Sequence, residues 1–335
     1  FSVPGLGGTL MPFQAAGVQF FEAANGRALC GDSMGLGKTI QALAWLQLHP
    51  EKRPALIICP ASIKINWNRE ASKWLTTKDK IITIEGQKTY DIAITGASIA
   101  IINYDLLQYW QARIEAWKPQ IAIIDEMHAI KNKKSLRSKA VQALAKSIPH
   151  ILGLTGTPVM NRPVELFTLL NVLDPAAWGN FWGYAQRYCD PHNNGFGWDF
   201  SGAANLEELH EKIKPYMIRR TKDQVLKELP DKRHVTLVIP FDDKMLDEYN
   251  SYIQAAIRGK QSEQLVFIEK AKQAAVKGKL PAAIHWIEEF LDNGEKLVVF
   301  CTHLATVDAL MERFGEYAVK VTGEVSQDNR QKAID

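Results

Sequence analysis

The sequence predicts an α/β protein whose first part is built on a doubly wound parallel sheet. Short runs of consecutive apolar residues recur along the chain, and such runs are typical of strands buried on both faces of a parallel sheet. Segments with helical periodicity separate these runs, as the crossover connections of parallel strands require. A glycine-rich stretch follows the first run, and an Asp-Glu pair follows a later one. On this fold, ligands gather at the carboxyl ends of the strands.

Length and composition narrow the possibilities without naming a function. A chain of 335 residues can form two domains with full cores, and its formal net charge of +3 is too small to indicate nucleic acid unless the basic surface is local. No apolar run reaches the roughly 20 residues that cross a bilayer, and the first residues lack the pattern of a signal peptide. The cysteines form no disulfide framework, which indicates a reducing compartment. We therefore expect an intracellular protein with no membrane partner; its cysteines are Cys30, Cys59, Cys189 and Cys301.

The expected elements of the first part follow one another in a regular alternation. A helix is predicted at residues 11–24 because its apolar residues recur near helical spacing, and Asn25-Gly26 ends it. A short strand at residues 27–30 leads into the glycine-rich stretch, and an apolar helix follows at residues 40–48. Further strands are predicted at residues 55–59, 81–84, 98–104, 121–124 and 151–154, with helices at residues 63–75 and 135–146.

The glycine-rich stretch from Gly31 to Thr39 predicts a phosphate-binding loop. A glycine-rich turn at a helix N-terminus directs several backbone N–H groups toward one point, where the helix dipole adds positive potential. Lys38 can then reach the outer phosphates of a nucleotide, and the Thr39 hydroxyl can ligate Mg²⁺. The strict form of this motif has glycine where this chain has Asp32, so we expect the turn to open differently there.

The Asp-Glu pair supplies the acids that nucleotide hydrolysis needs. Asp125 and Glu126 directly follow the apolar run at residues 121–124, so they are expected at a strand tip near the phosphate loop. A carboxylate in that position can hold Mg²⁺, and the next carboxylate can orient and deprotonate the attacking water. We therefore predict that Lys38, Asp125 and Glu126 are catalytic, that Thr39 and Asp125 are the Mg²⁺ ligands, and that Glu126 is the general base.

At residue 161, the regular alternation of apolar strands and helices in the sequence pattern is interrupted. Residues 161–217 are mostly helical in pattern and dense in aromatic residues, and the segment 195–198 is expected to be a loop. Residues 218–234 are charged and are interpreted as an interdomain connection. A second unit then begins, and one β-α-β unit with a fragment cannot close a second sheet, so we expect it to be incomplete as given. Its predicted strands are residues 235–239, 297–301 and 317–321, and its predicted helices are residues 244–279, 281–291 and 304–314.

Together with His128, the acids form a box, Asp125-Glu126-Met127-His128, that is specific enough to indicate a family. The sequence resembles a superfamily 2 helicase-type ATPase of the Swi/Snf chromatin-remodelling class. Residues 187–190 and 205–210 are most similar to the annealing-helicase branch, which acts on forked DNA. The other matching stretches, in the order of the family, are residues 10–14 with 17–18, 32–39, 59–62 with 67, 102–105, 130–132, 154–158, 219–222 and 298–301.

This resemblance implies an organisation and a set of roles. It implies a first RecA-like, ATP-binding lobe at residues 1–160, a helical insertion at 161–217, a connection at 218–234 and a partial second RecA-like lobe at 235–335. Gln14 would bond the adenine edge, while Met34, Gly35 and Gly37 would hold the nucleotide with Lys38 and Thr39. Ser62, Asn66, Tyr104 and Thr157 would contact DNA, and His128 and Thr155 would couple the two sites.

Purely structural explanations stay open for the residues that the resemblance implies contact DNA. Capping and turn chemistry explains Ser62, Asn66 and Tyr104 about as well as a contact with DNA does. A basic cluster could meet the phosphate backbone without reading sequence, or it could be a solvated helix start. This cluster consists of Lys131, Lys133, Lys134, Arg137 and Lys139.

The resemblance implies an ATP- and Mg²⁺-dependent motor that moves on double-stranded or forked DNA without sequence specificity. One alternative with the same core is a strand-separating helicase or a restriction-enzyme motor subunit. Another is a DNA-binding module that is gated by nucleotide but does not hydrolyse it. The family carries a glycine-rich motif and an arginine-rich motif in its second lobe, and neither occurs in this sequence. Because an arginine finger contributes about 10³-fold or more to hydrolysis, the sequence as given is expected to be a weak ATPase.

Overall fold

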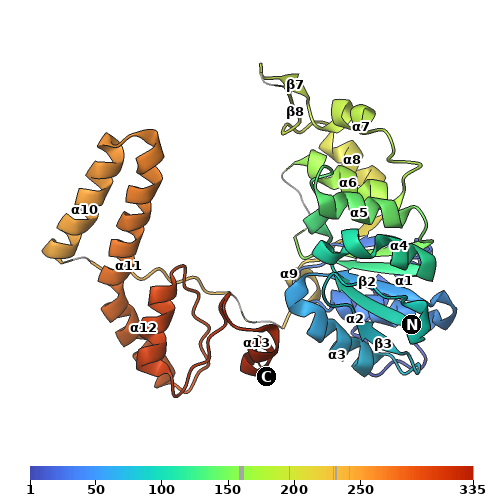
Figure 1. Ribbon diagram of the computed structural model, residues 1–335, viewed down its shortest axis with the longest axis horizontal. Helices are drawn as coiled ribbons and strands as arrows, with labels where there is room; N and C mark the ends of the chain where they lie inside the picture. Colours follow the sequence, from blue (N-terminus) through green and yellow to red (C-terminus); the bar gives the residue numbers. More distant parts are fainter. Residues whose placement is uncertain (158–161, 196, 229, 231, 241, 335) are drawn as a thin grey trace. The chain divides into compact units, whose positions relative to one another are not determined.

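The computed structural model describes residues 1–157, 162–195, 197–228, 230, 232–240 and 242–334. The chain divides into two compact units, unit 1 at Phe1–Pro230 and unit 2 at Asp231–Asp335 (Figure 1). Pro158 of one matched motif and the predicted boundary between residues 160 and 161 lie outside the described ranges, and the four-part division stays a prediction. Within the described ranges, no helix is both long enough and apolar enough to span a bilayer.

Unit 1 is built on a parallel sheet of seven strands, so the predicted α/β class is confirmed there. The strand order is β3-β4-β2-β5-β6-β1-β9. Every residue of β2, β4, β5 and β6 is buried, which is what continuous apolar runs predict for central parallel strands. The strands are β1 (Arg27–Cys30), β2 (Ala55–Cys59), β3 (Ile81–Thr83), β4 (Ile99–Asn103), β5 (Ile121–Asp125), β6 (His150–Leu154) and β9 (Met217–Ile218).

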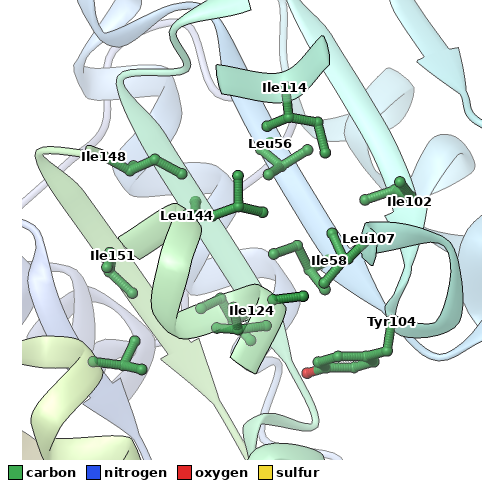
Figure 2. Packing of buried hydrophobic residues seen from close by; sticks show 14 of the residues in the cluster. Leu56, Ile58, Ile102, Tyr104, Leu107, Ile114, Ile124, Leu144, Ile148 and Ile151 are labelled. Carbon is green, nitrogen blue, oxygen red and sulfur yellow. The ribbon is translucent and has the colours of Figure 1, made fainter. Parts of the chain in front are cut away.

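Helices cover both faces of this sheet. On one face α4 and α5 pack over Leu56 and Ile58 of β2, and Figure 2 shows this core with Ile114 and Leu144 directed toward the strands. On the other face α1, α2 and α3 pack over Ile57, the residue between them, because strand side chains alternate in direction. The helices are α1 (Pro12–Ala23), α2 (Lys38–Leu48), α3 (Lys64–Trp74), α4 (Leu107–Trp117) and α5 (Leu136–Ala145), of which α4 is an addition to the predicted elements.

The aromatic-rich part of unit 1 forms a third core that packs beside the sheet. Its helices are mainly apolar on the sides that face each other, and Phe167, Tyr184 and Tyr188 are among the buried residues. The prediction of a loop at residues 195–198 is wrong at its end, because Trp198 pairs with Asn193 in a two-stranded antiparallel ribbon. The elements of this part are α6 (Pro163–Leu173), α7 (Phe181–Tyr188), β7 (His192–Asn193), β8 (Trp198–Asp199) and α8 (Leu206–Ile213), and α9 (Lys222–Val225) follows β9.

Unit 2 departs from the sequence predictions. Its predicted strands are wrong: residues 235–239, 297–301 and 317–321 belong to no ladder among the described residues, and Val238 and Phe300 are 87% and 94% exposed. An apolar run needs a neighbouring strand to bond its backbone, and these segments have none there. The predicted helix break at Pro281 is also wrong, because the break lies at Gly259 and Pro281 is inside a long helix. The helices are α10 (Asp243–Arg258), α11 (Gln261–Leu291), α12 (Leu304–Phe314) and α13 (Gln327–Ile334).

Candidate nucleotide site and its surroundings

The glycine-rich loop joins the end of β1 to the start of α2. Its backbone turns through Gly35 and Gly37, whose φ angles of 86° and 74° are in the left-handed region that favours glycine. A Cβ atom at Gly37 would lie 2.4 Å from Nε2 of Gln14, so any other residue there would displace the Gln14 amide. Lys38 and Thr39 are the first two residues of α2. The structure therefore places both at a helix N-terminus, as the motif predicts.

The Lys38 ammonium lies between the loop and the end of β6. Its Nζ donates to the carbonyl oxygens of Asp32 at 2.9 Å and Ser33 at 3.4 Å. A Cβ atom at Gly156 would be 3.3 Å from the same Nζ, and 2.5 Å from Cγ of Met34. The loop, its lysine and the segment after β6 thus surround one place at the carboxyl edge of the sheet.

Gln14 is placed beside the loop by hydrogen bonds at both ends of its side-chain amide. Its Oε1 accepts from the Met11 backbone N–H at 2.9 Å, and its Nε2 donates to the Leu36 carbonyl oxygen at 3.3 Å. The side chain is 7% exposed. Gln14 therefore fixes the start of α1 against the loop, and its implied contact with adenine stays a prediction.

Asp32 is held by Arg220, a partnership that the sequence motifs did not reveal. Asp32 is fully buried, and its Oδ1 accepts from the backbone N–H and from Nε of Arg220, both at 3.0 Å. Nη2 of Arg220 bonds the other carboxylate oxygen and also donates to Oε1 of Gln41 at 3.0 Å. Nη1 donates to the Phe13 carbonyl oxygen. One arginine after β9 therefore ties together the loop, α1 and α2, which explains an acid where the strict motif has glycine.

Asp125 is the last residue of β5 and is 8% exposed. Its Oδ2 accepts from the indole N–H of Trp67 at 2.8 Å, and its Oδ1 accepts from the Glu126 backbone N–H at 2.9 Å. Burial raises the pKa of the Asp125 carboxyl, while these two hydrogen bonds and the positive charge of Lys38 act to lower it. A nearby cation would stabilise the ionised form further. The contribution of Trp67 was not predictable from its place in the sequence alone.

Glu126 occupies a strained turn directly after the strand. Its φ of 48° is unusual for a residue with a side chain, and such strain is concentrated at functional sites. Oε2 of Glu126 lies 3.2 Å from Nδ1 of His128. The same ring nitrogen is 3.1 Å from Oγ1 of Thr155 and 3.4 Å from Oγ1 of Thr157. His128 thus connects the acid pair to the segment after β6, and the residues predicted for coupling are brought together.

The predicted DNA-binding residues differ in accessibility. Ser62, Asn66 and Thr157 are exposed. Tyr104 is 4% exposed, and its hydroxyl donates to the Asp125 carbonyl oxygen at 2.5 Å. This hydrogen bond helps to fix the backbone that carries the acid pair. Burial raises the pKa of this phenol well above its usual value. A contact between Tyr104 and DNA stays a prediction, and its burial makes a structural role the more direct explanation.

A groove of about 550 Å³ lies next to His128. Tyr104 lines it together with Lys131 and Arg137 of the basic cluster. Both cations have carboxylate neighbours: Lys131 is 3.3 Å from Glu165, and Arg137 is 2.7 Å from Asp105. These ion pairs are solvent-exposed and therefore weak, so both cations can exchange a carboxylate for a phosphate at small cost.

Comparison with known proteins gives a consistent result. The family model of the SNF2-related domain matches residues 13–302. The chain is 33% identical to the SWI/SNF-related matrix-associated actin-dependent regulator of chromatin subfamily A-like protein 1 of Xenopus tropicalis, over 97% of this chain and 36% of that protein. It is 34% identical to the DNA annealing helicase and endonuclease ZRANB3 of Mus musculus, over 96% of this chain and 32% of that protein. The chain thus spans about a third of the length of these relatives.

A solved structure supports the fold. The Sulfolobus solfataricus SWI2/SNF2 ATPase core in complex with dsDNA matches with a TM-score of 0.60 and 24% sequence identity, over 100% of this chain and 76% of that one. The same core without DNA matches with a TM-score of 0.59. The predicted RecA-like, doubly wound architecture is therefore confirmed.

Proposed function

The chain belongs to the SNF2-related family, and from that membership we propose that it is the ATP-binding part of a motor that moves on DNA. One observation carries the proposal. Lys38 and Thr39 begin α2, Asp125 ends β5 and Glu126 follows it, so both pairs lie at the carboxyl edge of one parallel sheet; burial raises the pKa of Asp125, and Lys38 is close enough for its charge to act against that rise. This convergence of an ammonium, a hydroxyl and two acids suits a nucleoside triphosphate.

The residues fit ATP with Mg²⁺. The backbone N–H groups at the start of α2 would face the phosphates, and the Lys38 ammonium would exchange its two carbonyl partners for phosphate oxygens. Thr39 and Asp125 offer the hard oxygen ligands that Mg²⁺ prefers, and Asp125 keeps lone pairs beyond its two hydrogen bonds. Bound there, Mg²⁺ would neutralise charge on the phosphates. Gln14 adjoins the loop and would hydrogen-bond the adenine edge.

Glu126 is proposed as the general base. Its backbone is in the left-handed region, and Nδ1 of His128 lies 3.2 Å from its Oε2. The carboxylate would orient a water molecule and receive its proton as the water attacks the terminal phosphate. The hydrogen bonds from His128 to Thr155 and Thr157 would transmit a change in the protonation of Glu126 to the exposed side of the segment after β6.

Double-stranded or forked DNA is the proposed track. Between Glu126 and Glu165 the sequence holds seven Lys or Arg residues and no Asp or Glu, and such a stretch contacts phosphates without reading sequence. Ser62, Asn66 and Thr157 would add hydrogen bonds to the backbone of the same strand. A relative named as a DNA annealing helicase and a structural neighbour that holds dsDNA support this choice.

Substitution of Glu126 by Gln tests the proposal. The amide cannot accept the proton, so the rate of DNA-stimulated ATP hydrolysis should fall by about 10²–10⁴-fold while the affinity for ATP is unchanged. The matched control is Glu115→Gln on α4, an exposed acid far from the loop, and it should hydrolyse ATP like the parent chain. Hydrolysis at the parent rate by the Glu126 variant would show that this residue is not the base.

The same assay separates the alternatives. If the parent chain binds ATP but releases no phosphate with duplex or forked DNA, not even at the low rate expected of a sequence without the arginine-rich motif, it is a nucleotide-gated binding module. If it hydrolyses ATP and also separates the strands of a forked duplex, it is a strand-separating helicase. The proposed translocase hydrolyses ATP on duplex DNA without releasing a strand.

A further inference from the structure

Four aromatic side chains form a continuous edge on the part of unit 1 built from α7 and β8. Phe181 contacts Phe200 with ring centroids 5.2 Å apart, Phe200 contacts Trp182 at 5.9 Å, and Trp182 contacts Trp198 at 5.0 Å. Each contact is edge to face. We name these four residues the aromatic edge. Figure 1 shows α7 and the β7–β8 ribbon at the end of unit 1 opposite α2 and α3.

Packing does not account for the outer half of this edge. The same segment has its own core, in which Tyr184 and Tyr188 are buried. Trp182 and Trp198 are instead 40% and 54% exposed. An indole is the largest apolar side chain, and two of them side by side at a surface mark a binding site more often than a stabilising contact.

The electrostatic surroundings favour an anionic ligand. The ammonium of Lys133 lies 3.0 Å from the ring centroid of Phe181, so the basic cluster directly adjoins the aromatic edge. This cluster belongs to the stretch between Glu126 and Glu165 that has seven cations and no acid. Carboxylates are also near: Glu165 lies 3.3 Å from Lys131, and Asp199, which follows Trp198, accepts from the Ser201 backbone N–H at 2.7 Å and keeps its negative charge. The five cations of the basic cluster outnumber these two carboxylates.

We propose that the aromatic edge binds unpaired nucleotides, with bases stacked on Trp182 and Trp198 and phosphates facing the basic cluster. A row of aromatic rings beside a basic surface is the combination with which proteins hold single strands without sequence preference. Paired bases are stacked inside a duplex and cannot use such rings, so the site distinguishes a single strand from a duplex. This inference rests on the proposed DNA motor. It adds that an unpaired strand of forked DNA binds at the aromatic edge.

The test compares an oligothymidylate with an abasic oligonucleotide of the same length, which has the same phosphates but no bases. The full chain should bind the oligothymidylate more tightly. Trp182→Ala and Trp198→Ala should each weaken that binding by roughly 5- to 150-fold, the range expected for the loss of one stacked base. Trp198→Phe keeps a ring and should retain most of the affinity. The matched control is Trp286→Ala in α11, which removes an indole that is 39% exposed and lies outside the edge.

The possible outcomes separate this inference from the proposed function. If both alanine variants bind oligothymidylate like the parent chain, or if the abasic strand binds equally well, the aromatic edge is not a stacking site. If those variants lose oligothymidylate binding but keep duplex binding and duplex-stimulated ATP hydrolysis, the inference stands. If the parent chain binds neither duplex nor single strand, the DNA motor itself is refuted together with the inference. Circular dichroism and thermal unfolding identify a variant that has failed to fold, and the comparison of oligothymidylate with the abasic strand on the parent chain then decides.

Discussion

At the scale of single residues, the loop depends on an ion pair that joins distant parts of the sequence. Asp32 is fully buried, and Arg220 reaches it with its backbone N–H and its guanidinium. Removing one member of a buried pair leaves the other charge without compensation. The resulting loss of stability is far larger than the stability that the intact pair contributes. The position of the phosphate loop is thus set partly by a residue close to the end of unit 1.

Arg220→Ala should therefore lower the free energy of unfolding by about 3–5 kcal/mol and weaken ATP binding, because Asp32 loses its partner next to the loop. Urea unfolding followed by circular dichroism, with ATP titration, measures both effects. Arg219→Ala is the matched control, since its side chain is exposed and a surface substitution changes stability by about 0.5 kcal/mol or less. Equal effects of the two substitutions would show that the ion pair does not hold the loop.

At the scale of elements, a second partly buried ion pair holds the sheet near its edge strand β3. Arg53 donates to Asp79 at 3.1 and 2.8 Å, and Ser98 donates to the same carboxylate at 2.8 Å. Burial acts to raise the pKa of Asp79, but the hydrogen bonds from Arg53, Thr77 and Ser98 outweigh it, so the pKa is lowered. A carboxyl with a lowered pKa stabilises the fold above its unfolded pKa and loses that effect as the pH falls through the folded value.

Asp79→Asn should consequently destabilise unit 1 by about 3–5 kcal/mol at pH 7, because Arg53 is left without its anion. The difference between variant and parent should shrink as the pH falls below about 4, the pKa of an aspartate in the unfolded chain, because the unfolded parent then takes up a proton and the folded parent does so only at the lower pKa of Asp79. Unfolding in urea at pH 7 and pH 3 measures both differences. A difference that is the same at both pH values would show that the charge of Asp79 is not what stabilises this edge.

In unit 1, the strands with a strong local pattern were predictable, and those made by long-range contacts were not. The apolar runs at residues 55–59 and 121–124 are central strands because both their faces are buried. β9 has only two residues and exists because it pairs with β1, a contact that no local pattern encodes. In the site, Lys38 and the acid pair were found from their motifs, but Trp67 and Arg220 act through side-chain bonds across the fold.

At the scale of the whole molecule, the two units differ in how they bury apolar residues. The central strands β2, β4, β5 and β6 of unit 1 are fully buried, whereas Val298 and Phe300 of unit 2 are 76% and 94% exposed. Backbone amides inside a buried ladder exchange with solvent only when the structure opens, and amides outside any ladder exchange freely.

Hydrogen exchange measured by mass spectrometry should therefore be slower in β5 than in residues 297–301 by roughly 10³-fold or more. The comparison uses two apolar runs of similar length within one chain, so intrinsic exchange rates are closely matched. Slow exchange in residues 297–301 would show that they form a paired strand in solution and would restore the prediction made from their sequence.

The central claim is that Lys38, Thr39, Asp125 and Glu126 surround one bound triphosphate. The most direct test is the affinity for ATP with Mg²⁺, measured by isothermal titration calorimetry for the parent chain and for Lys38→Ala, with Lys52→Ala, in a short 3-10 helix outside the loop, as the control. A charge-assisted hydrogen bond contributes about 1.5–3 kcal/mol, so Lys38→Ala should weaken binding by roughly 10- to 150-fold while the control binds like the parent. Equal affinity of Lys38→Ala and the parent chain would contradict the claim.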